Sequence, residues 1–206
     1  MNILRIMGLL TRRPCGIVTE SKVLVCSLDT RFRDSLEADS SVYSKYYRGV
    51  RTVFFSRMSD LLRAIESGYD IVHLFSPLSP TGLVADGQST TLSGTDLIGK
   101  CCESEVKLLW IANENEARDY VKGFNAAGKP LNLIMTISRN GAKFDRFLDE
   151  LLSRVSSGET LPLAWVSLVP QAQGPWQQEV PGCIFHAGRA AVKLPGVPRD
   201  PSRSSP

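Results

Sequence analysis

The sequence predicts an α/β protein with three layers, in which helices cover both faces of a mostly parallel β-sheet. Short apolar runs rich in Val, Ile, Leu and Phe alternate with stretches whose apolar residues recur at helical spacing. The apolar runs are continuous rather than alternating with polar residues, which is typical of strands buried on both faces. The repeated order of strand and then helix favours parallel strands joined by right-handed crossovers.

Three of the expected strands lie in the first half of the chain. They are residues 22–28 (KVLVCSL), 50–55 (VRTVFF) and 69–76 (YDIVHLFS). Residues 29–47 are mixed and polar, and they are expected to be helical in their first half. Residues 58–65 carry apolar side chains at helical spacing, with Ser56 or Ser59 as the N-cap and Gly68 at the end.

The second half of the chain continues the pattern after an insertion. Residues 77–92 contain prolines and glycines and predict a β-excursion with a tight turn at Asp86-Gly87. A short helix capped by Ser93 or Thr95 is expected to follow and to run through Cys102. The remaining expected elements are strands at 106–113, 132–138, 161–170 and 182–188 and helices at 115–127 and 141–157.

The pattern divides the chain into an N-terminal arm at 1–21, one domain at 22–194 and a tail at 195–206. With 206 residues, of which 43% are hydrophobic and 22% charged, the composition is that of a soluble globular protein whose core needs no disulfides. The apolar start of the arm is short and is interrupted by Arg5, so we do not expect a signal peptide. The composition of the tail predicts disorder.

Composition and spacing exclude several kinds of partner and cofactor. The net charge is only +3 and the basic residues are scattered, which argues against a nucleic-acid partner. No run reaches the roughly 20 apolar residues of a membrane helix. The two histidines lie far apart and no glycine-rich phosphate loop is present, so we expect neither a metal nor another cofactor. The five cysteines are irregularly spaced, which indicates reduced thiols in a cytoplasmic protein.

Polar residues follow three of the buried strands where each strand ends. His73 and Ser76 lie at the end of the third strand, and further polar residues follow the next two strands. These are Asn113, Glu114 and Asn115 after the fourth strand, and Ser138 and Arg139 after the fifth. Because parallel strands end at one edge of the sheet, we expect these residues to form a binding rim.

The two strands that end at Ser76 and Asn113 resemble the pair that bears the His–Cys dyad in the CHAT family of caspase-like peptidases. In that family the first strand ends His-Phe-x-Gly-His-Gly and the second ends Leu-Ser-Ala-Cys-x-x-Gly. In this alignment His73 matches the first, non-catalytic histidine. The catalytic histidine falls on Pro77 and the nucleophilic cysteine on Asn113, so neither reactive group is present.

The resemblance extends over roughly residues 22–194, which is most of the chain expected to be ordered. The stretch from Gly82 through Leu92-Ser93-Gly94-Thr95-Asp96-Leu97 is similar to the family's turn and helix start, and CIFHAGRAAVKL (183–194) is similar to its final strand. The resemblance implies a caspase-like fold that cannot cleave peptides. It further implies a scaffold, adaptor or regulator in the bacterial cytoplasm, bound to a protein partner such as a peptidase or a repeat protein.

Two active enzymes remain as alternatives. One is a cysteine peptidase with a relocated dyad of His73 and Cys101 or Cys102, although a histidine in an apolar strand is more often a core residue with both ring nitrogens hydrogen-bonded. The other is a nucleotide or NAD hydrolase that uses Glu114, on a flavodoxin-like or TIR-like doubly wound fold. We expect His186 and Cys183 to face opposite sides of a strand and to be structural.

Overall fold

The computed structural model describes residues 20–79, 82–85, 91–114, 123–124, 126, 128–139, 142–168, 183–188 and 192–197. The strands of its main sheet are β1 (Val23–Ser27), β2 (Val50–Phe54), β3 (Ile71–Phe75), β7 (Leu108–Ile111), β8 (Asn132–Thr136) and β9 (Cys183–Ala187). The α-helices are α1 (Arg33–Ser44), α2 (Met58–Ile65), α3 (Gly94–Glu103), α5 (Ala142–Ser156) and α6 (Leu161–Leu168). A short 3-10 helix, η1 (Thr30–Phe32), precedes α1.

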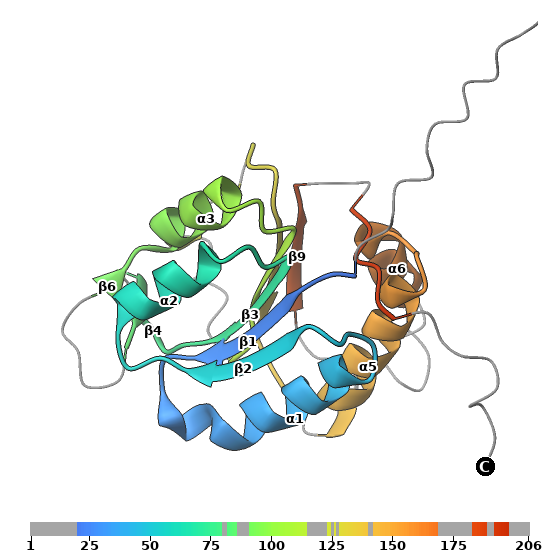
Figure 1. Ribbon diagram of the computed structural model, residues 1–206, viewed down its shortest axis with the longest axis horizontal. Coiled ribbons are helices and arrows are strands. Elements are labelled where there is room, and N and C mark those ends of the chain that lie inside the picture. Colours follow the sequence, from blue (N-terminus) through green and yellow to red (C-terminus); the bar gives the residue numbers. More distant parts are fainter. Residues whose placement is uncertain are drawn as a thin grey trace, which may run out of the picture.

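The main sheet has the strand order β2-β1-β3-β7-β8-β9, and Figure 1 shows β2, β1 and β3 side by side. Its first five strands are parallel, and β9 pairs antiparallel with β8. Strands β1, β3, β7 and β8 are buried along their whole length, as their continuous apolar runs predict. The predicted mostly parallel α/β sheet is therefore confirmed.

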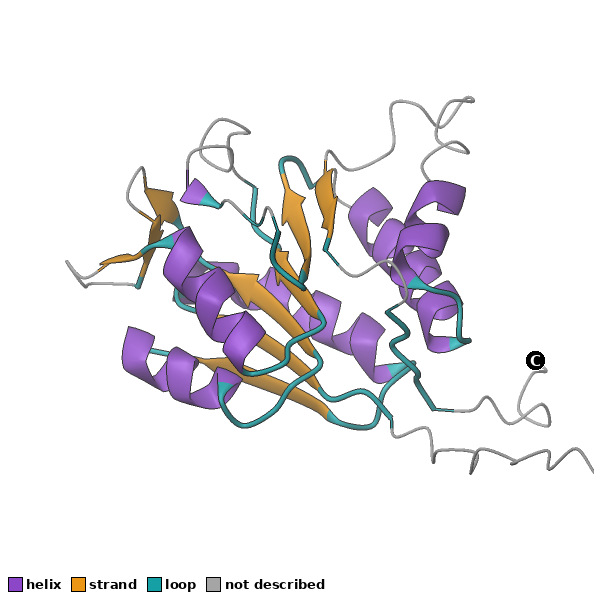
Figure 2. Ribbon diagram, turned by 90° about the horizontal axis from the view of Figure 1, so that it is seen from above, coloured by secondary structure: helices purple, strands orange, loops and turns teal. Residues whose placement is uncertain are grey.

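Helices cover both faces of this sheet and complete the three predicted layers (Figures 1 and 2). Leu61 of α2 and Leu97 of α3 pack with Val72 and Leu74 of β3 in one apolar core. On the other face, Tyr43 of α1 and residues of α5 and α6 pack with Ile71 and Phe75 of the same strand in a second core. Alternate residues of β3 thus face different helix layers, and His73 shares the α1 side with Ile71 and Phe75.

The predicted insertion after the third strand forms a small antiparallel sheet. Its strands are β4 (Leu78–Ser79), β5 (Gly82–Val84) and β6 (Thr91–Leu92). The predicted turn at Asp86-Gly87 lies outside the described residues. Helix α3 follows with Ser93 as its N-cap, and the Ser93 hydroxyl accepts a hydrogen bond of 3.0 Å from the Asp96 N–H.

Three local predictions were wrong. The run LPLAWVSLVP was expected to be a strand, but Leu161–Leu168 forms helix α6. Its apolar composition has no clear period, and the helix buries Leu161, Ala164 and Leu168 at helical spacing. Helix α1 extends to Ser44 instead of ending half-way, and the N-cap of α2 is Arg57 rather than Ser56 or Ser59.

Several predictions fall wholly or mostly outside the described residues, namely most of the arm at 1–21, most of the helix at 115–127 and the tail from 198 onward. Just before β1, the Ser21 N–H donates to the Pro195 carbonyl at 2.9 Å. The Tyr47 hydroxyl donates to the neighbouring Leu194 carbonyl at 3.0 Å. Two segments far apart in the sequence therefore lie side by side.

The described residues include four cysteines. Cys26, Cys101, Cys102 and Cys183 are free thiols. Among the described helices, none has the length and apolar character needed to cross a bilayer. Within the same residues, no group of three His, Cys, Asp or Glu side chains is arranged to hold a metal ion.

Candidate functional site

The polar residues that follow β3 and β7 meet where these strands end. The Ser76 N–H donates to Asn113 Oδ1 at 3.0 Å, so the Asn113 carboxamide bridges the two strands. Asn113 is only 3% exposed. The Ser76 hydroxyl donates to the carbonyl oxygens of Pro77, at 3.1 Å, and Val84, at 3.3 Å. Ser76 and Asn113 therefore close the edge of the sheet and hold the insertion against it.

His73 is a fully buried core residue with both ring nitrogens hydrogen-bonded, as its place in an apolar strand predicts. Its Nε2 lies 2.8 Å from Asp39 Oδ2, and its Nδ1 lies 3.0 Å from the Tyr43 hydroxyl. The ring also packs against Trp110, with centroids 5.1 Å apart. An imidazole bonded in this way has no free nitrogen with which to accept a proton from a substrate or a thiol.

Arg139, which lies in the segment after β8, belongs to the same buried network. Its guanidinium donates to both carboxylate oxygens of Asp39, at 2.7 and 2.9 Å, and to the Ala112 carbonyl at 3.1 Å. It also lies over the Phe144 ring, 3.7 Å from the centroid. The Arg139 side chain is 13% exposed and that of Asp39 is fully buried, so this is a two-pronged ion pair inside the protein.

The network has one consistent charge state near neutral pH. Burial would raise the pKa of Asp39, but hydrogen bonds from His73 and Arg139 outweigh it and hold that pKa below its usual value. Burial lowers the pKa of His73, although the hydrogen bond to Asp39 opposes this. Burial also raises the pKa of Tyr43 well above its usual value. The Asp39 carboxyl is therefore ionised and His73 is neutral. Because a carboxylate can only accept, the His73 Nε2–H donates to Asp39, and Nδ1 accepts from the Tyr43 hydroxyl.

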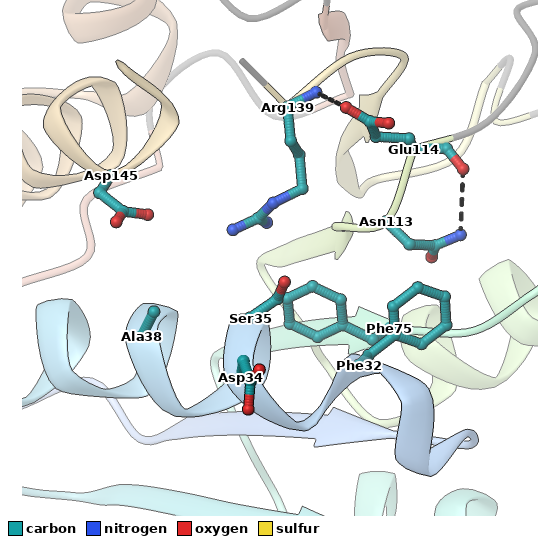
Figure 3. A pocket seen from close by; sticks show the side chains of 9 residues that line it. All are labelled: Phe32, Asp34, Ser35, Ala38, Phe75, Asn113, Glu114, Arg139 and Asp145. Carbon is teal, nitrogen blue, oxygen red and sulfur yellow. Dashed lines mark hydrogen bonds between the residues drawn. The ribbon is translucent and has the colours of Figure 1, made fainter. Parts of the chain in front are cut away.

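An open cleft of about 520 Å³ lies beside this network, at the ends of β3 and β7 (Figure 3). The start of helix α1 and the preceding 3-10 helix form one wall, Asp145 of α5 lies on another side, and Arg139 reaches between them. The lining residues are Phe32, Asp34, Ser35, Ala38, Phe75, Asn113, Glu114, Arg139 and Asp145. Clefts at the carboxyl ends of parallel strands are the usual ligand sites of open α/β sheets.

Only some residues of the predicted binding rim line this cleft. Asn113, Glu114 and Arg139 line it, and the Arg139 N–H donates to Glu114 Oε1. His73 and Ser76 lie beneath, fully buried, and Ser138 is half-buried and does not line the cleft. Asn115 lies outside the described residues.

Cys101 and Cys102, the two thiols of the predicted relocated dyad, lie on the other side of the sheet from His73. Cys101 packs in the core between the sheet and helices α2 and α3, whereas His73 lies on the α1 side. Burial raises the pKa of the Cys101 thiol far above its usual value, and Cys102 packs half-buried at the edge of the same core. Burial raises the pKa of Cys183, on β9, to about 11. The sheet thus separates the predicted partners of a relocated dyad, and thiols kept protonated by burial are poor nucleophiles.

Sequence reasoning missed the residues that helix α1 and the preceding η1 contribute. Asp39 and Tyr43 complete the network, and Phe32, Asp34 and Ser35 line the cleft. One signal was available for Asp39. Among the buried residues of α1 are Leu36, Asp39 and Tyr43, whose spacing places the aspartate on the apolar face of the helix. A carboxylate on that face needs buried partners, which points to a network.

The arrangement offers an open cleft, and none of the described residues that line it is a histidine or a cysteine. A scan against protein-family models and a search of curated proteins found no match for this chain. Function is therefore inferred from the residues of the site and from the sequence resemblance.

Proposed function

We propose that this chain is a catalytically inactive, CHAT-like domain of caspase type that acts by binding a protein partner, as a scaffold, adaptor or regulator. One observation supports this most strongly. Pro77 and Asn113 occupy the two positions where the resemblance places the catalytic histidine and cysteine. Proline has no titratable group, and a carboxamide is neither nucleophilic nor ionisable near neutral pH.

The contacts of the site support a non-catalytic role. The Asn113 carboxamide is bonded to the Ser76 N–H, and the ring nitrogens of His73 are bonded to Asp39 and Tyr43. These groups stabilise the ends of adjacent elements, and a reaction would require them to break those bonds. The open cleft beside them is large enough for part of a partner chain, since ligand sites commonly measure about 300 to 1,000 Å³.

The proposal is tested by incubating the purified protein with a broad peptide library and searching for new termini by mass spectrometry. We expect no cleavage, and we expect a subset of the peptides to be retained by the immobilised protein. A change at the cleft wall, Ser35→Arg, should reduce that retention because the longer side chain fills the cleft. Cleavage that disappears in Cys101→Ala or Cys102→Ala would overturn the proposal.

A hydrolase is the second candidate, and the position of Glu114 in the cleft lining favours it. A carboxylate at the carboxyl ends of the strands could act on a nucleotide or on NAD. Turnover of such a substrate that is lost in Glu114→Gln would support this candidate. Absence of turnover, or an equal rate in the variant, would reject it.

A further inference from the structure

We infer that the cleft receives a cationic side chain, arginine or lysine, presented by a peptide segment of the protein partner. This inference rests on the proposed function, since it assigns the partner's chemistry at the same cleft. The charges of the lining residues, an aromatic wall and the size of the cleft each contribute to it.

The lining of the cleft has more negative than positive groups. Asp34, Glu114 and Asp145 contribute three carboxylates, and Arg139 is the one basic residue among them. The Arg139 charge is already matched, because its guanidinium binds both oxygens of buried Asp39. A positively charged side chain of a partner would therefore meet carboxylates that no other basic residue of the lining neutralises.

Three basic residues in or directly after η1 and α1 form ion pairs with other carboxylates. Arg31 pairs with Asp29 at 2.6 Å, Arg33 with Glu37 at 3.9 Å and Lys45 with Asp149 at 2.9 Å. In the part of the chain that the structure describes, no ion pair is formed by Asp34, Glu114 or Asp145. Asp34 and Asp145 lie in the first turns of α1 and α5, where a negative charge favours the helix, and Asp34 is exposed while Asp145 is half-buried.

An aromatic wall completes the site for such a side chain. The rings of Phe32 and Phe75 stack with centroids 5.7 Å apart, and both line the cleft. Arg139 already lies over Phe75, 5.2 Å from the centroid, whereas no described cation lies over Phe32. The hydrocarbon stem of an arginine or lysine can pack on Phe32 while its charged end reaches Asp34 or Asp145.

The inference is tested by fluorescence anisotropy with one labelled peptide scaffold whose central residue is arginine, lysine, citrulline, norleucine or glutamate. We expect the arginine and lysine peptides to bind about tenfold more tightly than the citrulline and norleucine peptides, and the glutamate peptide to bind weakest. The preference should shrink when salt is raised, because it is electrostatic. Equal or tighter binding of the norleucine or glutamate peptide would overturn the inference.

Matched variants identify the carboxylates responsible. Asp34→Asn and Asp145→Asn should each weaken binding of the arginine peptide several-fold without changing the norleucine peptide. Asp60→Asn is the control, because Asp60 lies in the first turn of α2, away from the cleft lining, and it should leave both affinities unchanged. Equal losses in all three variants would overturn the assignment.

The outcomes separate this inference from the proposed function. If other peptides bind and Ser35→Arg abolishes that binding, the cleft is a binding site of different preference, and only the cationic assignment falls. If no peptide in the series binds, the cationic assignment also falls. Cysteine-dependent cleavage in the library experiment would instead remove the proposed function itself.

Discussion

At the scale of single residues, Asp39 is the acceptor that joins three elements around the strand ends. It lies on α1, and it accepts hydrogen bonds from His73 of β3 and from Arg139 after β8. All three side chains lie inside the protein, so the energetic cost of removing one partner is large even where the intact ion pair itself adds little to stability.

We predict that Asp39→Asn lowers the free energy of unfolding by about 3 to 5 kcal/mol, because the Arg139 charge would lose its carboxylate within the protein. Urea unfolding followed by circular dichroism would measure the loss. Asp60→Asn, an exchange of the same kind on an exposed helix turn, should change the free energy of unfolding by less than about 0.5 kcal/mol. A loss below about 1 kcal/mol for Asp39→Asn would contradict the network as described.

The buried histidine predicts a dependence of stability on pH. Burial lowers the pKa of His73, with the hydrogen bond to Asp39 opposing, so protonation favours the unfolded chain, where histidine has a pKa of about 6.5. The free energy of unfolding should be nearly constant above about pH 7.5. It should fall as the pH drops below about 6.5, by up to about 1.4 kcal/mol per pH unit, until the folded-state pKa is reached.

Unfolding curves recorded between pH 7.5 and 5 would measure this loss. Only two histidines are present, so His186→Gln is a natural control and should retain the fall in stability. His73→Gln should be less stable at pH 7.5 but should lose most of the fall. The carboxyl of Asp39 adds a separate window, because its lowered pKa gives stability that disappears only at pH values below about 3.9. An identical fall in both variants would contradict the assignment to His73.

At the scale of elements, the strands could be predicted from sequence and one helix could not. The continuous apolar runs of β1, β3, β7 and β8 have the composition that burial on both faces requires, and their positions were predicted within a few residues. The run that forms α6 is equally apolar, so its composition did not distinguish a helix from a strand. Packing of Trp165 against Phe147 of α5 and Phe185 of β9 fixes the helix in place.

Some residues of the cleft could be predicted from sequence, and others could not. Asn113, Glu114 and Arg139 follow strands directly, so the parallel order alone brings them to one edge. Phe32 ends η1, and Asp34 and Ser35 lie at the start of α1, so their place beside that edge depends on how these helices pack on the sheet. The spacing of Leu36, Asp39 and Tyr43 indicates which face of α1 is buried. Where the helix lies on the sheet is a long-range property that this local pattern does not give.

The N-cap of α3 gives a prediction at the scale of one helix. Sequence allowed Ser93 or Thr95, and Ser93 is the residue whose hydroxyl accepts from the Asp96 N–H. Ser93→Ala should therefore lower the free energy of unfolding by about 1 kcal/mol. Thr95→Ala is the matched control and should be close to neutral, because Thr95 is exposed and lies past the cap. Equal losses in chemical unfolding of the two variants would contradict the cap assignment.

At the scale of the whole molecule, the layered fold places an open cleft beside the ends of β3 and β7, where the proposed caspase-like assignment puts the catalytic groups of an active peptidase. The parallel sheet brings the ends of β3 and β7 together, and the helix layer on one face supplies the cleft walls. Pro77 and Asn113 lie at those ends. The Asn113 side chain links the two strands by accepting a hydrogen bond from the Ser76 N–H. We therefore expect the architecture to accept a nucleophile and base at these positions if they are introduced.

Restoring the two reactive groups tests the central claim most directly. The variant Asn113→Cys would be compared with the double variant Pro77→His/Asn113→Cys for its rate of alkylation by iodoacetamide at pH 6.5, after circular dichroism shows that both are folded. We predict a rate at least about tenfold higher in the double variant, because a histidine beside the introduced thiol favours the thiolate. Equal rates in the two folded proteins would mean that positions 77 and 113 do not form a dyad site, and this would contradict the degenerate caspase-like assignment.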